Sequence, residues 1–287
     1  MARRGSPFYF IDLEKTMTFF LAVVVCSVAV TGIIDAVQRR MFGVRPGVMI
    51  EDQPVERLYH REVRALLEGM AAMENVPPQN AYIHKTTGKV MPEVPGVELN
   101  IDETLFRVMA ASPGQIIYPT RYIVYPRIRT ADLEQITATL AGYATGLIGS
   151  WQRTENIKLA AAAINNTLLM PGEEFSFNGV VGERTAERGY RAAPIFVGEG
   201  VVPGLGGGIC QVSSTLYNVV LRTPGLIVTE RVPHSRRVAY VPPGKDATVA
   251  WPHTDFKFRN ERKTPIVIRA QVYRGRIAIE IDGVPDG

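Results

Sequence analysis

The stretch LGGGICQVSSTLYNVVL occupies residues 205–221. Its three successive glycines let the backbone adopt positive φ and approach a neighbour or a ligand closely. At 100° per residue the next twelve positions separate into two faces. One face is apolar and carries Val212, Leu216, Val219 and Val220, whereas the other carries Cys210, Ser213, Ser214 and Tyr217. We therefore expect a glycine loop followed by a helix over 210–221, with Cys210 in the first turn.

Cys210 is the candidate nucleophile. The chain has only two cysteines, and the other, Cys26, lies in an apolar segment near the N-terminus. An unpaired thiol in an exported domain tends to oxidise, so its presence calls for a chemical reason. The positive end of a helix favours a thiolate, and free N–H groups of the glycine loop can hold an oxyanion. The alternative is a buried, inert cysteine at a tight turn.

A nucleophilic cysteine needs a base, and two of the four histidines follow Cys210 in the sequence. His234 comes at the end of a predicted strand, where catalytic side chains often lie, and is the candidate base. His253 lies in a polar turn and is the weaker candidate. The carboxylate that orients the imidazole is either Asp255 or Asp246, and the sequence does not choose between them.

The residues beside this pair are candidates for substrate binding. Arg236 follows His234 closely and can bind a carboxylate. The full set consists of Gly206, Gly207, Gly208, Ser213, Ser214, Tyr217 and Arg236.

Two other site chemistries are less well supported. A zinc site made by Cys210, His234 and His253 lacks a close ligand pair of the C-x-x-C kind. The acidic residues near 173–187 resemble a glycosidase pair only by type, and solvated turn charges are the simpler interpretation. We expect no metal and no cofactor.

The first forty residues contain a membrane signal. Residues 16–34 carry no charge, and nineteen residues are about the length that crosses a bilayer as a helix. The alternatives are a buried helix of a soluble domain and a signal peptide cleaved after Ala29. We favour an uncleaved anchor that places residues 38–287 outside the cytoplasm, since long C-terminal domains translocate regardless of nearby charge. The flanking charges are Arg3, Arg4 and Lys15 before the segment and Arg39, Arg40 and Arg45 after it.

The composition fits a folded protein with no nucleic-acid partner. Hydrophobic residues make up 46% of the 287 positions and charged residues 21%, which argues against wholesale disorder. The net charge is only +4, without a lysine or arginine block. A mildly basic surface suits an anionic polymer such as a bacterial wall.

Periodicity and turn residues predict an α+β protein with two units after the N-terminal segment. The first spans 48–130, with helices over 55–73 and 103–111 (the second capped by Asp102), a hairpin over 81–90 and a strand over 116–125. The second begins near 151 and is mostly β. Its elements are a helix over 155–169, strands over 194–197, 226–232, 238–241 and 248–251, and a hairpin formed by 265–273 and 276–282.

Four segments of the second unit resemble the VanW family, which is named for a protein of vancomycin-resistance clusters. They are NIKLAAAAINNTLLMPGEEFSFN (156–178), VPGLGGGICQVSSTLYNVVL (202–221), ERVPHSRRVAYVPPGKDATV (230–249) and DFKFRNERKTPIVI (255–268). Residues 77–102 are similar to the peptidoglycan-binding-type domain that often precedes a VanW domain. The expected division is a cytoplasmic tail and anchor over 1–37, a peptidoglycan-binding-like domain over 48–130 and a VanW domain over 151–287.

The resemblance implies a cell-wall function. Some members with this architecture are implicated as L,D-transpeptidases, which implies that Cys210 is the nucleophile, His234 the base and peptidoglycan stem peptides the substrates. A histidine at position 253, just before Asp255, departs from the family pattern. A carboxypeptidase that uses the same site, and a non-catalytic wall-binding scaffold linked to the wall or to glycopeptide resistance, are the alternatives.

Overall fold

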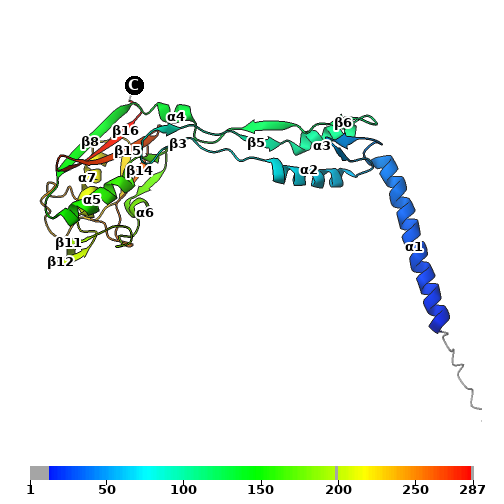
Figure 1. Cartoon of the computed structure of the whole chain (residues 1–287), viewed down its shortest axis with the longest axis horizontal. Helices are drawn as coiled ribbons and strands as arrows, with labels where there is room; N and C mark the ends of the chain where they lie inside the picture. Colours follow the sequence, from blue (N-terminus) through cyan, green and yellow to red (C-terminus); the bar gives the residue numbers. More distant parts are fainter. Residues whose placement is uncertain (1–12, 198–199, 286–287) are drawn as a thin grey trace, which may run out of the picture. The chain divides into compact units, whose positions relative to one another are not determined.

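The structure, a computed structural model, describes residues 13–197 and 200–285 and has a mixed α+β fold (Figure 1). The chain divides into two compact units. One consists of Met1–Pro78 with Pro95–Val124, and the other of Gln79–Val94 with Tyr125–Gly287. Residues 79–94, which lie within the expected domain 48–130, pack with the second unit. Ala81, Ile83, Leu133 and Val267 form a buried cluster there.

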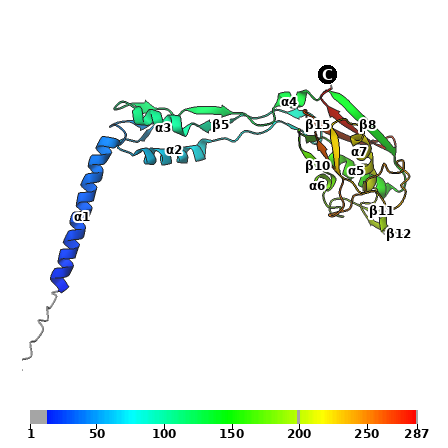
Figure 2. The same cartoon turned by 180° about the vertical axis from the view of Figure 1, so that it is seen from behind.

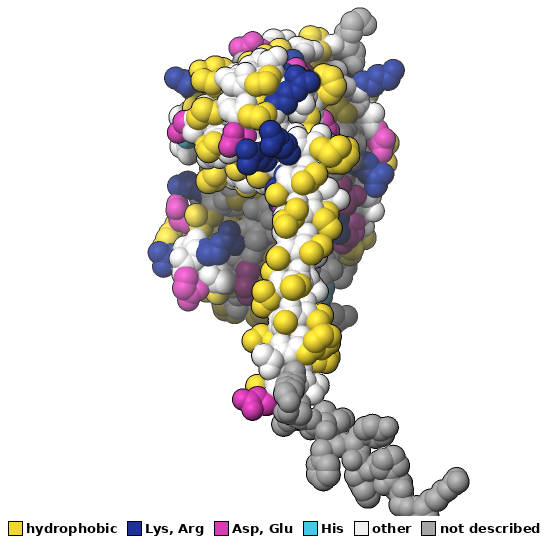
Figure 3. Space-filling model, turned by 90° about the vertical axis from the view of Figure 1, so that its right-hand side faces the viewer, with side chains coloured by type: hydrophobic (Ala, Val, Ile, Leu, Met, Phe, Trp, Pro, Cys, Tyr) yellow, Lys and Arg dark blue, Asp and Glu magenta, His cyan; other side chains and the backbone are white. Residues whose placement is uncertain are grey.

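The first unit begins with one long helix, α1 (Leu13–Phe42). Its stretch Thr16–Phe42 has a mean hydropathy of 2.5 and none of it is buried. Hydrophobic side chains cover the visible face of this helix in Figure 3. The length and composition fit a membrane span or a signal sequence. Arg3 and Arg4 lie outside the described residues.

The rest of the first unit packs two helices with short strands. Val63 and Leu67 of one helix and Leu105 and Val108 of the other are buried in one core. Asn100 caps α3, not Asp102 as predicted, because its side chain accepts the N–H of Glu103 at 3.0 Å. The elements are β1 (Met49–Ile50), β2 (Gln53–Pro54), α2 (His60–Glu74), β5 (Gly96–Leu99), α3 (Ile101–Ala110), β6 (Ile116–Ile117) and β7 (Arg121–Val124).

The second unit contains a four-stranded antiparallel sheet, ordered β8-β16-β15-β9, and a three-stranded sheet, ordered β10-β14-β13. β15 and β16 pair from Ile266 with Gly283 to Tyr273 with Arg276. The elements are β3 (Tyr82–Ile83), β4 (Val90–Met91), α4 (Thr130–Glu134), β8 (Ala138–Gly146), α5 (Trp151–Ile164), β9 (Thr167–Leu169), β10 (Glu174–Ser176), α6 (Phe177–Val181), β11 (Ala192–Val197), β12 (Gly200–Leu205), α7 (Ile209–Val220), β13 (Leu226–Glu230), β14 (Lys257–Asn260), β15 (Ile266–Tyr273) and β16 (Arg276–Gly283).

Helix α7, the helix predicted from the opening stretch, is held in the core of this unit. It packs against β8 and β16, and α5 packs beside it against β15 (Figure 2). Every second residue of β16 faces this core, so Ile277, Ile279 and Ile281 are fully buried. Each such side chain contributes about 1.5–3 kcal/mol by leaving water. The apolar face of α7 therefore fixes where the opposite face, which carries Cys210, lies.

Several boundaries differ from the prediction. Helix α5 ends at Ile164 rather than continuing to 169, because Asn165 is extended and Asn166 takes a φ of 57°, which asparagine tolerates. Leu168 consequently belongs to β9. Residues 238–241 form no strand, and residues 248–251 make only isolated bridges, through Thr248 and Ala250. β8 was not predicted.

Candidate active site

The glycine loop positions Cys210 at the start of α7. Gly208 is the N-cap residue, with a φ of 107°. A Cβ on Gly207 would lie 2.7 Å from the carbonyl oxygens of both Ala193 and Pro194, so only glycine fits against β11 at this point. Cys210 lies in the first turn, as predicted, and is half-buried.

A buried amide fixes the same loop from the other side. Asn156 of α5 donates from Nδ2 to the carbonyl oxygens of Arg191 at 2.9 Å and Gly207 at 3.0 Å. Its Oδ1 accepts the backbone N–H of Arg191 at 2.8 Å. Because Asn156 is fully buried, this network determines the loop's position. The sequence signal that could have found it is a polar residue on the apolar stripe of a helix.

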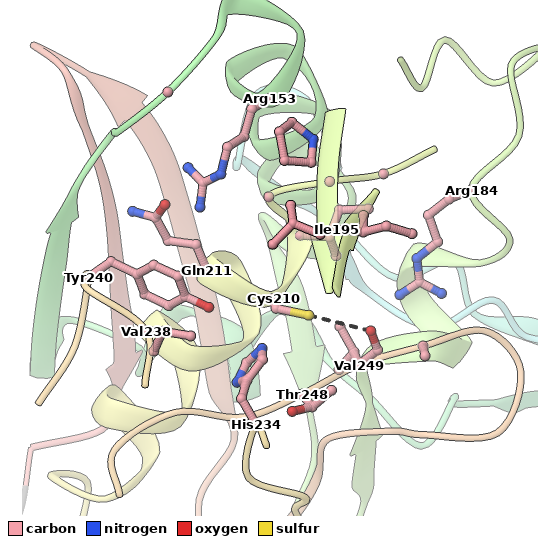
Figure 4. Close-up of a pocket in the computed structure, with 18 of the residues that line it drawn as sticks. Arg153, Arg184, Ile195, Cys210, Gln211, His234, Val238, Tyr240, Thr248 and Val249 are labelled. Atoms are coloured by element: carbon pink, nitrogen blue, oxygen red, sulfur yellow. Dashed lines mark hydrogen bonds between the residues drawn. The ribbon is translucent and has the colours of Figure 1, made fainter. Parts of the chain in front are cut away.

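His234 and Asp246 lie beside Cys210. Nδ1 of His234 is 2.7 Å from Oδ2 of Asp246, and the backbone N–H of His234 donates to the same oxygen at 2.6 Å. In Figure 4 the imidazole points toward Cys210. Burial lowers the pKa of His234, but a hydrogen bond with the Cys210 side chain and the charges of Cys210 and Asp246 raise it above 6.5 overall. The structure therefore brings together a thiol, an imidazole and a carboxylate in that order.

Asp246 is itself held in place. Arg231 donates to its backbone oxygen at 2.7 Å and to its Oδ1 at 3.2 Å. Burial raises the pKa of Asp246, but the hydrogen bonds from His234 outweigh it and leave the pKa below 3.8. Asp246 is therefore ionised at neutral pH and able to stabilise an imidazolium.

Asp255, the other carboxylate left open by the sequence, lies in a different environment. It accepts the Ser176 hydroxyl at 2.5 Å and the backbone N–H groups of Asn178 and Phe256 at 2.8 Å each. Asp255 thus joins β14 to the start of α6, whereas Asp246 is the carboxylate that contacts His234.

Cys210 opens into a cavity of about 780 Å³. The glycines at 206–208 line it, as do residues of β11, β12 and the segment 237–251. The thiol donates to the carbonyl oxygen of Val249 at 3.5 Å (Figure 4). The backbone N–H groups of Gly207, Gly208 and Cys210 donate to no residue among 13–197 and 200–285. These N–H groups therefore have hydrogen-bonding capacity left for a ligand.

Four of the predicted substrate-binding residues do not line this cavity. Ser213 and Ser214 are fully buried and donate to the carbonyl oxygen of Ala247 at 2.7 and 3.4 Å, so they hold the chain next to Asp246. Tyr217 packs edge-on against Phe256.

Arg236 is exposed, and it is Arg237 that borders the cavity. His253 is also exposed and lies outside the lining. Within the described ranges no group of three or more histidine, cysteine, aspartate or glutamate side chains is placed to hold a metal ion.

The polar lining residues that sequence reasoning missed include Arg153, Arg184, Gln211 and Tyr240. Gln211 donates to Thr145 and to the carbonyl oxygen of Gly146, tying α7 to the end of β8. Burial raises the pKa of Tyr240, which therefore keeps its proton at neutral pH. No motif marks these positions, because they converge only through the fold.

The part of the chain that contains this site is similar to a known protein family. The family described as VanW like protein matches residues 152–282. Residues 152–282 are thus a VanW-like domain. This domain contains the glycine loop and the Cys210, His234 and Asp246 side chains. No solved structure matches the chain.

Two curated relatives support the VanW assignment. Uncharacterized protein YoaR of Bacillus subtilis (strain 168) is 47% identical over 171 residues, which cover 59% of this chain and 56% of the relative. Vancomycin B-type resistance protein VanW of Enterococcus faecalis (strain ATCC 700802 / V583) is 34% identical over 111 residues, 37% of this chain and 40% of the relative. The chain thus spans about half the length of these two relatives.

Proposed function

We propose that this protein is a cysteine L,D-transpeptidase of the bacterial wall. The VanW-like domain at residues 152–282 supports a cell-wall related role. The observation that carries the finer proposal is the row formed by Cys210, His234 and Asp246 at the wall of one cavity. A thiol beside a buried imidazole that a carboxylate orients is the arrangement that acyl transfer through a thioester requires.

The proposed reaction has two steps. The Cys210 thiol passes its proton to His234, its sulfur attacks the carbonyl carbon of diaminopimelate in a tetrapeptide stem, and the loop N–H groups receive the negative oxygen. The amide C–N bond then breaks, His234 gives its proton to the leaving nitrogen, and D-Ala departs. The amine of a neighbouring stem, losing a proton to His234, next attacks the thioester. A new C–N bond forms as the C–S bond breaks, which yields a 3→3 cross-link and restores Cys210.

The remaining parts of the proposal concern location. Helix α1 anchors the chain through residues 16–34, and residues 38–287 lie outside the cytoplasm. The region 48–130 binds the wall polymer, as its resemblance to peptidoglycan-binding domains implies. This arrangement delivers the VanW domain to stem peptides near the membrane.

The test uses the full-length protein in detergent micelles with a purified disaccharide-tetrapeptide. We expect release of D-Ala and formation of cross-linked dimers, both lost in Cys210→Ala and both retained in the matched control Cys26→Ala. D-Ala release without dimers means that water is the acceptor and that the protein is a carboxypeptidase. A folded wild-type protein that releases no D-Ala yet binds sacculi contradicts the enzyme and supports the wall-binding scaffold.

A further inference from the structure

Arg184 is a half-buried cation at the cavity, and its two terminal nitrogens have no hydrogen-bond partner. It lines the same cavity as Cys210. Neither Nη1 nor Nη2 is accessible to solvent, and neither has a hydrogen-bond partner in the described part of the chain. A guanidinium carries five N–H donors, and buried donors are rarely left without an acceptor. An acceptor held in the cavity would satisfy these donors once the guanidinium turns toward it.

Gly206 and Phe177 fix the position of the Arg184 side chain. A Cβ on Gly206 would lie 3.0 Å from Cγ and 3.2 Å from Cβ of Arg184, so the first loop glycine packs directly against the arginine stem. The guanidinium lies 5.9 Å from the centre of the Phe177 ring, which supports its flat face. In Figure 4 it lies on the side of the cavity nearest Val249.

The electrostatics of the cavity favour an anion. Its lining carries Arg153, Arg184 and Arg237, with Glu183 as the one carboxylate among the described lining residues. Burial lowers the pKa of Arg184, while the charges of Tyr190, Cys210 and Asp255 act in the opposite direction, so Arg184 and the Cys210 sulfur lie within electrostatic reach of each other.

Arg153 is already engaged. Its Nη1 donates to the carbonyl oxygen of Ile148 at 2.8 Å, and its guanidinium lies 5.8 Å from the centre of the Tyr240 ring. Arg237 is exposed to solvent, so among the three lining arginines Arg184 is the one with buried guanidinium nitrogens that lack an acceptor.

We propose that Arg184 binds the free C-terminal carboxylate of the acyl donor, one residue beyond the carbonyl that Cys210 attacks. This inference rests on the proposed transpeptidase function and adds its substrate class, a peptide that ends one residue after the scissile bond. A carboxylate matches the flat, forked geometry of a guanidinium. The contact also fixes which carbonyl reaches the sulfur, so Arg184 determines specificity for tetrapeptide over pentapeptide donors.

The first test needs no enzymatic activity. Full-length protein is alkylated with iodoacetate or with neutral iodoacetamide, and carboxymethylation or carbamidomethylation of Cys210 is timed by peptide mass spectrometry. In each case an S–C bond forms and iodide leaves. We expect Arg184→Met to lower the iodoacetate-to-iodoacetamide rate ratio about tenfold, the factor that one charge-assisted hydrogen bond supplies, and Arg184→Lys to restore part of it.

The matched control is Arg191→Gln, because the Arg191 side chain is exposed and outside the cavity lining. We expect this variant to leave the ratio unchanged. An unchanged ratio in a folded Arg184→Met protein overturns the anion site. If Arg184→Met does not fold, the same comparison is made with Arg184→Lys against Arg184→Gln.

The second test uses donors. The wild type is expected to release the C-terminal residue faster from a tetrapeptide acid than from its C-terminal amide, and Arg184→Met to lose about tenfold of that preference. A tetrapeptide that is amidated on the side-chain carboxylate of diaminopimelate keeps its C-terminal carboxylate. We expect it to react as fast as the unmodified tetrapeptide acid. If the alkylation ratio falls but no donor reacts, the anion site stands and the transpeptidase fails. If donors react without sensitivity to Arg184, the transpeptidase stands and this inference fails.

Discussion

Oδ2 of Asp246 accepts both the backbone N–H of His234 at 2.6 Å and its ring Nδ1 at 2.7 Å. One carboxylate oxygen therefore fixes the position of the residue and the orientation of its imidazole. The second ring nitrogen is then directed to the Cys210 side chain, whose hydrogen bond helps to raise the pKa of His234. The geometry gives Asp246 the role of orienting carboxylate, which the sequence left open between two residues.

Replacing Asp246 by Asn removes a charge that raises the pKa of His234. We expect that pKa, measured by NMR of the imidazole protons, to fall by about one pH unit. D-Ala release is expected to fall about a hundredfold, because general acid–base catalysis depends on the orientation and charge of the base. Glu155→Gln, which removes an exposed carboxylate, is the control. An unchanged pKa in Asp246→Asn contradicts the assignment.

The raised pKa of His234 also predicts how stability depends on pH. The folded state binds this proton more tightly than the unfolded chain, whose value is near 6.5. Its stabilisation is therefore fully present below pH 6.5 and is lost as pH rises through the folded pKa. Urea unfolding of the wild type and of His234→Gln at several pH values measures this pH-dependent stabilisation. We expect the difference in free energy of unfolding to shrink as pH rises, and a constant difference argues against a raised pKa.

Gly207 is predicted to be irreplaceable for packing reasons. A Cβ at this position would lie 2.7 Å from two backbone carbonyl oxygens. These atoms belong to the main chain, so they cannot move aside by a change of rotamer as a side chain can. We expect Gly207→Ala to lower the free energy of unfolding by about 1–3 kcal/mol. Gly146→Ala is the matched control, since nothing lies within 4 Å of its added Cβ. Equal stability of the two variants in urea contradicts the close approach.

Asn156 tests the buried network behind the glycine loop. Asn156→Ala leaves the N–H of Arg191 and the carbonyl of Gly207 without a partner, whereas the carbonyl of Arg191 keeps the N–H of Gly206 at 3.3 Å. We expect a loss of about 1–3 kcal/mol, the cost of unsatisfied buried polar groups. Glu155→Ala, at the neighbouring half-buried position, removes only a partly exposed ion pair with Lys158 and is expected to change stability by less than about 1 kcal/mol. Thermal unfolding of both proteins measures the difference, and similar losses in the two variants speak against the network.

The features that the sequence predicted correctly are local. Helix α7 and the placement of Cys210 in its first turn follow from glycine conformation and helical periodicity, and the terminal hairpin β15–β16 follows from alternation around Arg274-Gly275. Local rules fail where tertiary contacts decide. Ser213 and Ser214 face away from the apolar stripe, as expected, yet the chain around Ala247 covers them.

The same limit explains the residues that were missed. Arg153 comes from α5, Arg184 from the segment after α6 and Tyr240 from a loop, and only the fold brings them to one cavity. The choice between Asp246 and Asp255 depends on which loop meets His234, and sequence spacing carries no information about that contact. The expected strand over 238–241 is instead irregular chain that forms the cavity wall.

The central claim, that Cys210 forms a thioester with a stem peptide, is tested most directly by intact-protein mass spectrometry. The full-length protein is mixed with a disaccharide-tetrapeptide and quenched with acid at short times. The account predicts a mass increase equal to the donor less D-Ala, located on Cys210 by peptide mapping and absent from Cys210→Ala. No adduct and no D-Ala from a folded protein whose Cys210 still reacts with iodoacetamide would contradict it.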